Sequence, residues 1–336
     1  AAQVRVKTVN KRGGVDGRKL VIQTCDTNNN NPAKAKACAA SLIGKGADIM
    51  FVTCDVEFSA PATQEAINRG ILAVAPCIGT DQMGPKRFGA KGKLAFSFGN
   101  VAQDEGSAMA EVAWRNGWRS AALATNTLLV YFKNVVQAFE KRFTQLGGKI
   151  AGRESYATGA NNVNTAVSRL NGRKADVIVT STAFGELPAL VSGLRSLGNK
   201  TPILNSWAGD GTYWLPKTPQ VTDYYAVTFA SAFGDDPNKA VRALAKQLKA
   251  FTGGFVTGSA AIDGVATAIR RSGGSTNGTT LAATMEKFRK VPTLSGLVSF
   301  SPQFHTVYGR QYRVIKIHNN KARYVGAVTA KVVPKI

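Results

Sequence analysis

The chain carries few of the side chains that enzymes use for catalysis. Its 336 residues include two histidines, His305 and His318, and neither lies in a strand-to-helix turn that presents a catalytic serine. No G-x-G-x-x-G dinucleotide fingerprint follows an expected strand, and no G-x-x-x-x-G-K-[ST] phosphate loop is present. The four cysteines lack CxxC spacing, so a zinc site is not expected. We therefore predict no enzyme activity, no cofactor and no metal site.

A different group of residues falls in five short segments, each directly after an expected strand. The segments are 55–61, 78–81, 126–134, 182–186 and 207–214. They contain aromatic rings, a hydroxyl group and two carboxylates, namely Glu57, Phe58, Thr80, Tyr131, Phe184, Trp207 and Asp210. Apolar walls with a few polar groups are typical of small-molecule sites. Any one of these aromatic residues could equally belong to a core, so it is their shared position that predicts a ligand-binding site.

Short apolar runs alternate with helical patterns along most of the chain. The runs predict buried strands of a parallel sheet over 19–25, 47–54, 71–77 and 94–100. Helices are expected over 32–43 and 59–70, with Pro32 and Pro61 near their starts. This alternation predicts an α/β layer structure with right-handed crossovers.

A second alternating series follows the first. It predicts strands over 120–125, 154–158, 175–182, 202–206 and 224–231. The last part, 311–328, predicts a hairpin around Asn319–Asn320, because asparagine tolerates positive φ in a tight turn.

One α/β segment occurs twice. Residues 10–54 have the pattern of a glycine turn, a strand, an Asn-rich loop, a helix and a strand, and 147–182 form a shorter copy. The repeat predicts two Rossmann-like lobes with parallel sheets, lobe 1 from 1–98 and 232–295 and lobe 2 from 99–231 and 296–336. Three strand-like crossings are expected near 96–100, 227–231 and 296–300. Such lobes would leave a cleft between the carboxyl ends of their sheets.

The chain is strongly basic. Lys and Arg total 43 against 20 Asp and Glu, a net charge of +23. The basic residues are scattered and form no RRM, KH or zinc-finger signature, so we expect no nucleic acid partner. The excess of basic residues then indicates either a solvated basic surface or attraction to an anionic envelope surface. No apolar run approaches the roughly 20 residues that span a bilayer. The first residues do not have the pattern of a secretory signal, so we expect that any signal was removed or never existed.

Several motifs follow one another in a recognisable order. They are "VNKRGGVDGRKLVIQTCDTNNNNPAKAKACAASLI" at 9–43, "GILAVAPCIGT" at 70–80, "RFTQLGGKIAGRESY" at 142–156, "LRSLGNKTPIL" at 194–204 and "GLVSFSPQFHTVYG" at 296–309. Their order resembles that of type I periplasmic solute-binding proteins, the branched-chain amino acid, amide and urea receptors of ABC importers. The resemblance covers nearly the whole chain. It implies a bilobal fold that closes on a small molecule and performs no chemistry.

The resemblance also implies roles for individual residues. In lobe 2, Tyr131 would stack on the ligand, Phe184 would follow the next strand, and Asp210 would lie near the carboxylate that pairs with a ligand ammonium group. Phe255, in the second part of lobe 1, would also reach the cleft.

In lobe 1, the resemblance places Cys77 and Thr80 in a loop that offers backbone and hydroxyl groups to a ligand carboxylate. The sequence departs from the family pattern at Glu57 and Phe58, which stand where small hydroxyl residues usually hold that carboxylate. An α-amino acid ligand is therefore in doubt. The chain also begins inside a helix that the family places after a first strand, so we expect the first strand of lobe 1 to be absent and the sequence to be part of a longer chain.

The cysteines predict disulfides and an oxidising compartment, because an even number is confined to one region. In the frame of the family, Cys54 and Cys77 end adjacent strands and can pair, which leaves Cys25 for Cys38. The alternative bridge, Cys25 with Cys54, resembles one found in parts of the family, and buried free thiols are a third possibility. We favour the first pairing because it leaves no thiol over.

These observations together predict an extracytoplasmic solute-binding protein, periplasmic or on the cell surface. Its ligand would be a small polar metabolite such as an amino acid, an amide, urea or a small carboxylate. Its partner would be the membrane permease of an ABC importer. The alternative is a ligand-sensing module of a receptor or regulator with the same fold.

Overall fold

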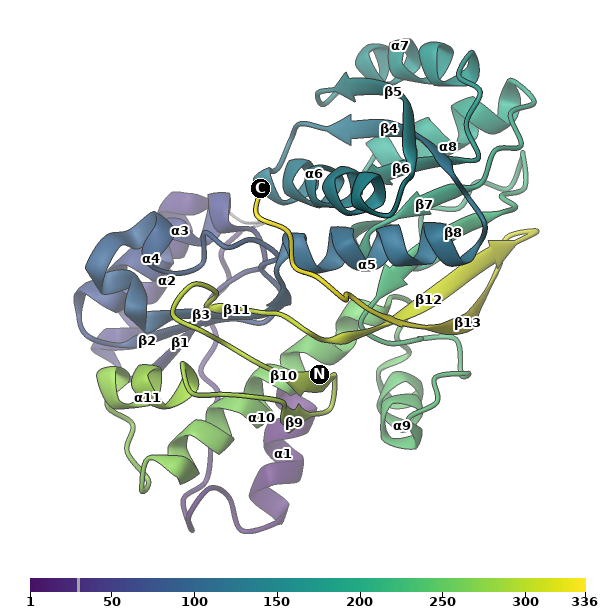
Figure 1. Ribbon diagram of the computed structural model, residues 1–336. Coiled ribbons are helices and arrows are strands. Elements are labelled where there is room, and N and C mark those ends of the chain that lie inside the picture. Colours follow the sequence, from purple (N-terminus) through teal and green to yellow (C-terminus); the bar gives the residue numbers. More distant parts are fainter. Residues whose placement is uncertain (29–30) are drawn as a thin grey trace. The chain divides into compact units, whose positions relative to one another are not determined.

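The computed structural model describes residues 1–28 and 31–336, which divide into two compact units. Unit 1 comprises Ala1–Val101 and Val256–Arg310, and unit 2 comprises Ala102–Phe255 and Gln311–Ile336. The chain passes from one unit to the other three times, the number that the sequence predicts, but the second and third passages follow Phe255 and Arg310 and not the predicted segments 227–231 and 296–300. Figure 1 labels the elements of both units along the chain.

Unit 1 contains a four-stranded parallel sheet with the order β1-β2-β3-β11. Its strands are β1 (Ile49–Phe51), β2 (Leu72–Ala75), β3 (Ala95–Asn100) and β11 (Thr306–Val307), with a separate antiparallel pair, β9 (Val291–Thr293) and β10 (Gly296–Val298). Its helices are α1 (Ala2–Lys11), α2 (Pro32–Gly44), α3 (Val56–Asn68), α4 (Pro85–Phe88), the 3-10 helix η1 (Gly89–Leu94), α10 (Val256–Arg271) and α11 (Gly278–Met285). Because β10 and β11 pair inside unit 1, residues 296–310 belong to it, whereas the sequence placed them in lobe 2.

Helices α1, α10 and α11 share a buried cluster with the sheet of unit 1. Phe96 and Phe98 point to the same face of β3, because side chains alternate along a strand, and both belong to this cluster. Helix α10 passes close to the strand at Gly264, where a Cβ atom would lie 2.1 Å from the Phe98 ring. Helices α2 and α3 pack against each other. The core of unit 1 therefore joins segments from both ends of its sequence.

The predicted strand 19–25 is wrong. These residues adopt no regular structure, and Val21 is 81% exposed. In the second copy of the repeat, β5 (Lys149–Tyr156) forms because it pairs along its length with β4 (Ser120–Asn126). In the part of unit 1 that is described, β1 is the edge strand of the sheet with β2 as its neighbour, and residues 19–25 do not pair with it. Residues 29–30 of the predicted Asn-rich loop lie outside the described residues.

Unit 2 contains a seven-stranded sheet with the order β13-β12-β8-β7-β6-β4-β5. Besides β4 and β5, its strands are β6 (Val177–Ser181), β7 (Ile203–Asn205), β8 (Tyr224–Thr228), β12 (Gln311–His318) and β13 (Lys321–Thr329). The five strands from β5 to β8 are parallel, and β12 is antiparallel to both β8 and β13. The helices are α5 (Ala102–Arg115), α6 (Val130–Gln145), α7 (Ala160–Asn171), α8 (Glu186–Ser196), η2 (Trp207–Gly209), α9 (Lys239–Leu248) and η3 (Gly253–Phe255).

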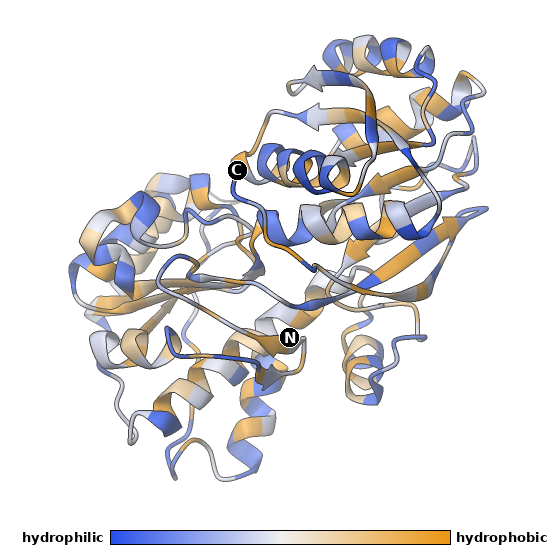
Figure 2. Ribbon diagram, in the orientation of Figure 1, coloured by the Kyte–Doolittle hydropathy of each residue, from blue (hydrophilic) through white to orange (hydrophobic). Residues whose placement is uncertain are grey.

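Two helix pairs cover the parallel part of this sheet. Helices α5 and α6 pack together, as do α7 and α8, and the second pair shares a core with Ala122 and Ala124 of β4. Figure 2 shows apolar colours along the strands and alternating colours on helices such as α6 and α7. The predicted hairpin is confirmed, with Asn319 and Asn320 at φ 50° and 60° in its turn.

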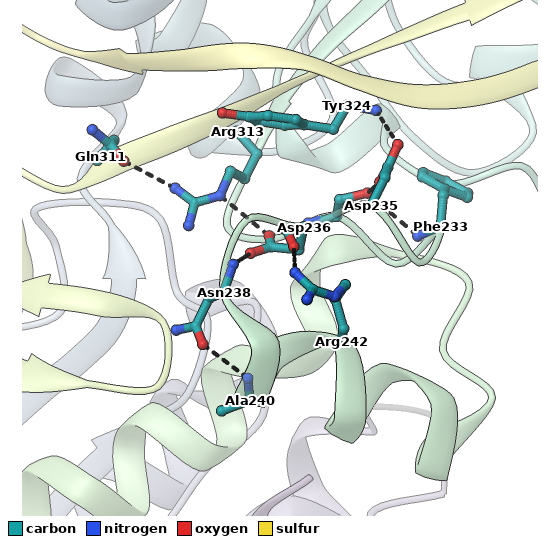
Figure 3. A network of polar contacts seen from close by, with 10 residues as sticks. Phe233, Asp235, Asp236, Asn238, Ala240, Arg242, Gln311, Arg313 and Tyr324 are labelled. Carbon is teal, nitrogen blue, oxygen red and sulfur yellow. Dashed lines mark hydrogen bonds and ion pairs between the residues drawn. The ribbon is translucent and has the colours of Figure 1, made fainter.

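A polar network attaches the segment after β8 to the rest of unit 2 (Figure 3). Asp236 is buried and accepts hydrogen bonds from the backbone N–H groups of Ser231 and Asn238, both at 2.8 Å. Arg313 of β12 donates to the same carboxylate at 3.2 Å. The backbone N–H of Tyr324 in β13 donates to the neighbouring Asp235 at 2.7 Å. These bonds attach the start of segment 232–255 to β12 and β13 of unit 2, and the whole segment belongs to unit 2 and not to lobe 1 as the sequence suggested.

Candidate functional site

Aromatic rings from several segments gather at the carboxyl ends of the parallel strands of unit 2. Tyr131 lies in the first turn of α6 after β4, and its ring centroid is 6.1 Å from that of Trp207 in η2 after β7. Trp207 is 5.3 Å from Phe229 after β8, and Tyr131 is 5.8 Å from Phe132. Phe132 in turn lies 6.4 Å from Phe184, which follows β6. We call these five residues the aromatic row, and it unites three residues that the sequence singled out.

Two members of the aromatic row remain accessible to solvent. Phe184 is 53% exposed and Trp207 is partly exposed, whereas Tyr131 is buried. The backbone of Phe184 has φ 52°, a conformation that bulky residues rarely adopt and that is enriched at functional positions. The row therefore presents aromatic surface supported by buried rings.

Glu105 joins two residues of the aromatic row. It is buried in the first turn of α5, and its Oε2 accepts a hydrogen bond from the Tyr131 hydroxyl at 2.7 Å. Its Oε1 accepts from the backbone N–H of Trp207, also at 2.7 Å. Burial raises the pKa of Glu105 to about 8. The negative charges of Asp104 and Asp210 also raise this pKa, whereas the two hydrogen bonds lower it.

Glu105 was not among the predicted site residues, because those residues lie in segments after strands and Glu105 lies in a helix. One signal was available. Asp104 and Glu105 are adjacent acids in the first turn of a helix that is buried along most of its length, and both are buried. A buried carboxylate pair of this kind requires hydrogen-bond donors nearby.

Asp210 connects the end of η2 to β8 and η3. Its Oδ2 accepts hydrogen bonds from the Thr228 hydroxyl and from the backbone N–H of Gly253, the latter at 2.6 Å. The carboxylate is buried, and burial raises its pKa to about 7 despite these donors and the backbone N–H of Gly254.

The other polar groups at these strand ends bond to one another. The Oγ atoms of Ser181 and Ser206 are 2.8 Å apart, at the ends of β6 and β7. Asn205 donates to the Tyr224 hydroxyl at 2.9 Å, which donates to the carbonyl of Gly209 at 2.7 Å. A Cβ atom on Gly209 would lie 1.9 Å from the Asn205 amide nitrogen, so this position requires glycine. The hydroxyl and amide groups thus support the aromatic row from within the protein.

The candidate residues of unit 1 occupy a different setting. Glu57 and Phe58 lie in the first turn of α3, so the predicted loop 55–61 is wrong and Pro61 lies inside the helix. The helix starts earlier because Val56 already belongs to its buried face. Burial and the charge of Glu57 raise the pKa of Asp55, at the start of the helix, to about 6.

Thr80 and Cys77 lie after β2. Thr80 is buried, and its hydroxyl accepts from the backbone N–H of Gln82 at 3.3 Å, while its carbonyl accepts from the Thr306 hydroxyl at 2.7 Å. Phe255 belongs to unit 2, where it ends η3. The preceding Gly254 lies against Trp207, since a Cβ atom there would be 3.4 Å from the indole ring.

The favoured disulfide pairing is confirmed. Cys25 bonds to Cys38, and Cys54 bonds to Cys77, with Cα atoms 5.6 and 4.8 Å apart respectively. The second bridge joins the segments that follow the adjacent parallel strands β1 and β2. It holds two strand ends of unit 1 together at its candidate loops.

A comparison with known protein families identifies the chain. The profile of the family described as periplasmic binding protein matches residues 1–322. The chain belongs to this family. Periplasmic binding proteins are solute-binding proteins and not enzymes, which agrees with the prediction from the sequence.

Individual relatives of this periplasmic binding protein are distant. Leu/Ile/Val-binding protein homolog 3 of Brucella melitensis biotype 1 is 22% identical over 310 residues, covering 89% of this chain and 81% of the relative. The structure of leucine-binding protein LivK from Thermotoga maritima MSB8 matches with a TM-score of 0.81 at 18% identity, over 98% of this chain and 93% of that one. A solute-binding protein of an ABC transporter from R. palustris, solved with 4-hydroxybenzoate, matches with a TM-score of 0.79 at 17% identity, over 98% and 92%. These structures establish the fold.

Two further observations concern this periplasmic binding protein. Across residues 1–28 and 31–336, no three His, Cys, Asp or Glu side chains are grouped so as to hold a metal ion. None of the helices described is both long and apolar enough to cross a membrane.

Proposed function

We propose that the protein is the solute-binding component of an ABC importer and captures a small metabolite at the carboxyl ends of the unit 2 strands. The aromatic row carries the proposal, because it combines accessible rings with fixed support. Membership of the periplasmic binding protein family supports it. The relatives named for leucine, isoleucine and valine, and the neighbour solved with 4-hydroxybenzoate, support a ligand with an apolar body.

The chemistry of the site favours contact with an apolar ligand surface. Aromatic side chains contribute large contact areas with few rotatable bonds, so ordering them costs little entropy. Phe184 and Trp207 would contact the ligand, and Tyr131 would position Trp207 through their shared carboxylate. Binding that favours one conformation of the protein would let a permease distinguish loaded from empty protein.

A thermal-shift screen tests the proposal. The compounds are L-leucine, L-isoleucine, benzoate, 4-hydroxybenzoate, urea and acetamide. A ligand present at about 100 times its dissociation constant stabilises the folded state by about 2.7 kcal/mol and raises the melting temperature. If none of the six compounds raises the melting temperature, the proposed ligand range is wrong.

A pair of variants tests the place of binding. Trp207→Ala should weaken binding of the best compound by about tenfold or more, equivalent to about 1.4 kcal/mol. Trp118→Ala is the matched control. Trp118 precedes β4 and is also partly exposed, and its ring contacts that of Tyr225 in β8. Equal losses in both variants would count against the aromatic row as the binding surface.

The importer and the compartment are part of the same proposal. An extracytoplasmic location is supported by family membership and by two disulfides, which persist in oxidising environments. Uptake of the identified ligand by cells should fall when the gene for this protein is deleted and recover when the gene is reintroduced. Unchanged uptake would argue for a ligand sensor with the same fold.

A further inference from the structure

Asp210 is enclosed by donors from its own unit. The hydroxyl of Thr228 and the backbone N–H of Gly253 both donate to Oδ2, and the backbone N–H of Gly254 also donates to the carboxylate. Only 4% of the residue is exposed. The three donors come from two segments, β8 and η3, that are separated in sequence from Asp210.

Two glycines allow the backbone to approach the Asp210 carboxylate closely. A Cβ atom on Gly253 would lie 2.0 Å from the carbonyl oxygen of Ala230 and 3.0 Å from Oδ2 of Asp210. On the other side, a Cβ atom on Gly211 would lie 2.7 Å from the carbonyl oxygen of Phe251. Glycine at both positions lets the backbone approach closely, so the carboxylate fills the space between the segments.

The other acids near the aromatic row are also engaged internally. Both oxygens of Glu105 accept hydrogen bonds, from Tyr131 and from the backbone of Trp207. Oδ2 of Asp104 accepts from the Tyr312 hydroxyl at 2.8 Å. The raised pKa values of Glu105 and Asp210 agree with carboxyl groups that lack a permanent cationic partner.

We propose that Asp210 links segments within unit 2 and does not pair with a ligand ammonium group. The site then takes a ligand with an aromatic or branched aliphatic body and no ammonium group. This inference rests on the proposed function and narrows its ligand class. It assigns ligand recognition in unit 2 to the accessible rings of Phe184 and Trp207.

The expected preference follows from the cost of burying a charge. An ammonium group that leaves water without an anionic partner loses hydration that the aromatic rings do not replace. A ligand with the same carbon skeleton but no amino group avoids this cost and keeps the apolar contacts. We expect the compound without the amino group to bind at least tenfold more tightly.

Two matched pairs of compounds test this expectation by isothermal titration calorimetry at pH 7. L-Phenylalanine is compared with 3-phenylpropionate, and L-leucine with 4-methylpentanoate; each pair differs only in the α-amino group. Choline is added as a cation that aromatic faces alone can hold. Tighter binding of the deaminated member in at least one pair is the expected result.

Tighter binding of an amino acid than of its deaminated partner, or binding of choline, would overturn the inference and leave the proposed function standing. No binding by any of the five compounds would also overturn the inference, whereas the proposed function is tested separately by the six compounds of the thermal-shift screen. Asp210→Asn gives a second readout, with Asp176→Asn as control, because Asp176 also accepts two backbone N–H groups, those of Arg119 and Ser120. Asp210→Asn should lower the melting temperature and leave the affinity ratio within each pair unchanged. A selective loss of amino acid binding in this variant would show that Asp210 contacts an ammonium group.

Discussion

Replacement of Glu105 by glutamine should make the stability of unit 2 less dependent on pH. The pKa of Glu105 rises from 4.5 to about 8 in the folded protein. Between these two values the unfolded chain ionises while the folded protein keeps its proton, so the free energy of unfolding falls as pH rises. The change is about 1.4 kcal/mol per pH unit, and over about 3.5 units it amounts to about 5 kcal/mol. Glutamine does not ionise and removes this slope.

The expected result is that the stabilities of the two proteins diverge as pH rises. Glu105→Gln should be close to the wild type in stability at pH 5, where the wild-type carboxyl is protonated in the folded state. At pH 9 the variant should be the more stable protein by several kcal/mol, because the wild type then holds a buried charge. Asp210 contributes its own slope at lower pH in both proteins, since its pKa is about 7.

Urea unfolding followed by tryptophan fluorescence measures this effect in unit 2 specifically. All four tryptophans of the chain lie in unit 2, namely Trp114, Trp118, Trp207 and Trp214. Glu140→Gln, which removes a glutamate from an exposed ion pair with Arg153, measures the general effect of the substitution. A Glu105→Gln variant that is less stable than the wild type at pH 9 would refute the reasoning. It would mean that an ionised Glu105 and its two hydrogen bonds stabilise the fold.

Three further predictions concern the disulfide, the polar network and the charge. Replacing Cys54 and Cys77 together with serine should lower the free energy of unfolding of unit 1 by about 3 kcal/mol, measured by hydrogen exchange of β2 and β3 amides; unchanged protection would contradict this. Asp236→Ala removes a buried carboxylate that accepts hydrogen bonds from the partly buried Arg313 and from two backbone N–H groups, and should destabilise unit 2 by about 3 kcal/mol, measured by urea unfolding; a loss below about 1 kcal/mol would show that the network is dispensable. With a net charge of +23, the protein should bind anionic vesicles at low salt and release them as salt rises, and salt-independent binding would exclude an electrostatic origin.

The sequence predicted the parts of the fold that local patterns determine. Apolar runs bounded by Gly or Asp identified β1 and β2, and the Asn319–Asn320 pair identified the hairpin. The run 19–25 has the same local character but pairs with no strand, although a strand is stable only when it forms hydrogen bonds to a neighbour. Local pattern alone does not report the presence of that neighbour.

The candidate site was predicted to a similar extent. Position after a strand located Tyr131, Phe184 and Trp207, since parallel strands end at one edge of a sheet. The same reasoning could not find Glu105, whose contacts with Tyr131 and Trp207 depend on how α5 packs against the sheet. It also could not show that the Asp210 carboxylate accepts hydrogen bonds from Thr228 and Gly253, which are distant in sequence.

A fluorescence titration tests the central claim most directly, namely that the aromatic row of unit 2 binds a small molecule. The titrant is the compound with the largest thermal shift, and the proteins are the wild type, Trp207→Phe and Trp118→Phe. The account predicts a saturable change in tryptophan emission for the wild type and Trp118→Phe, and its loss in Trp207→Phe. The same saturable change in Trp207→Phe would contradict the account, because Trp207 would then not report ligand binding.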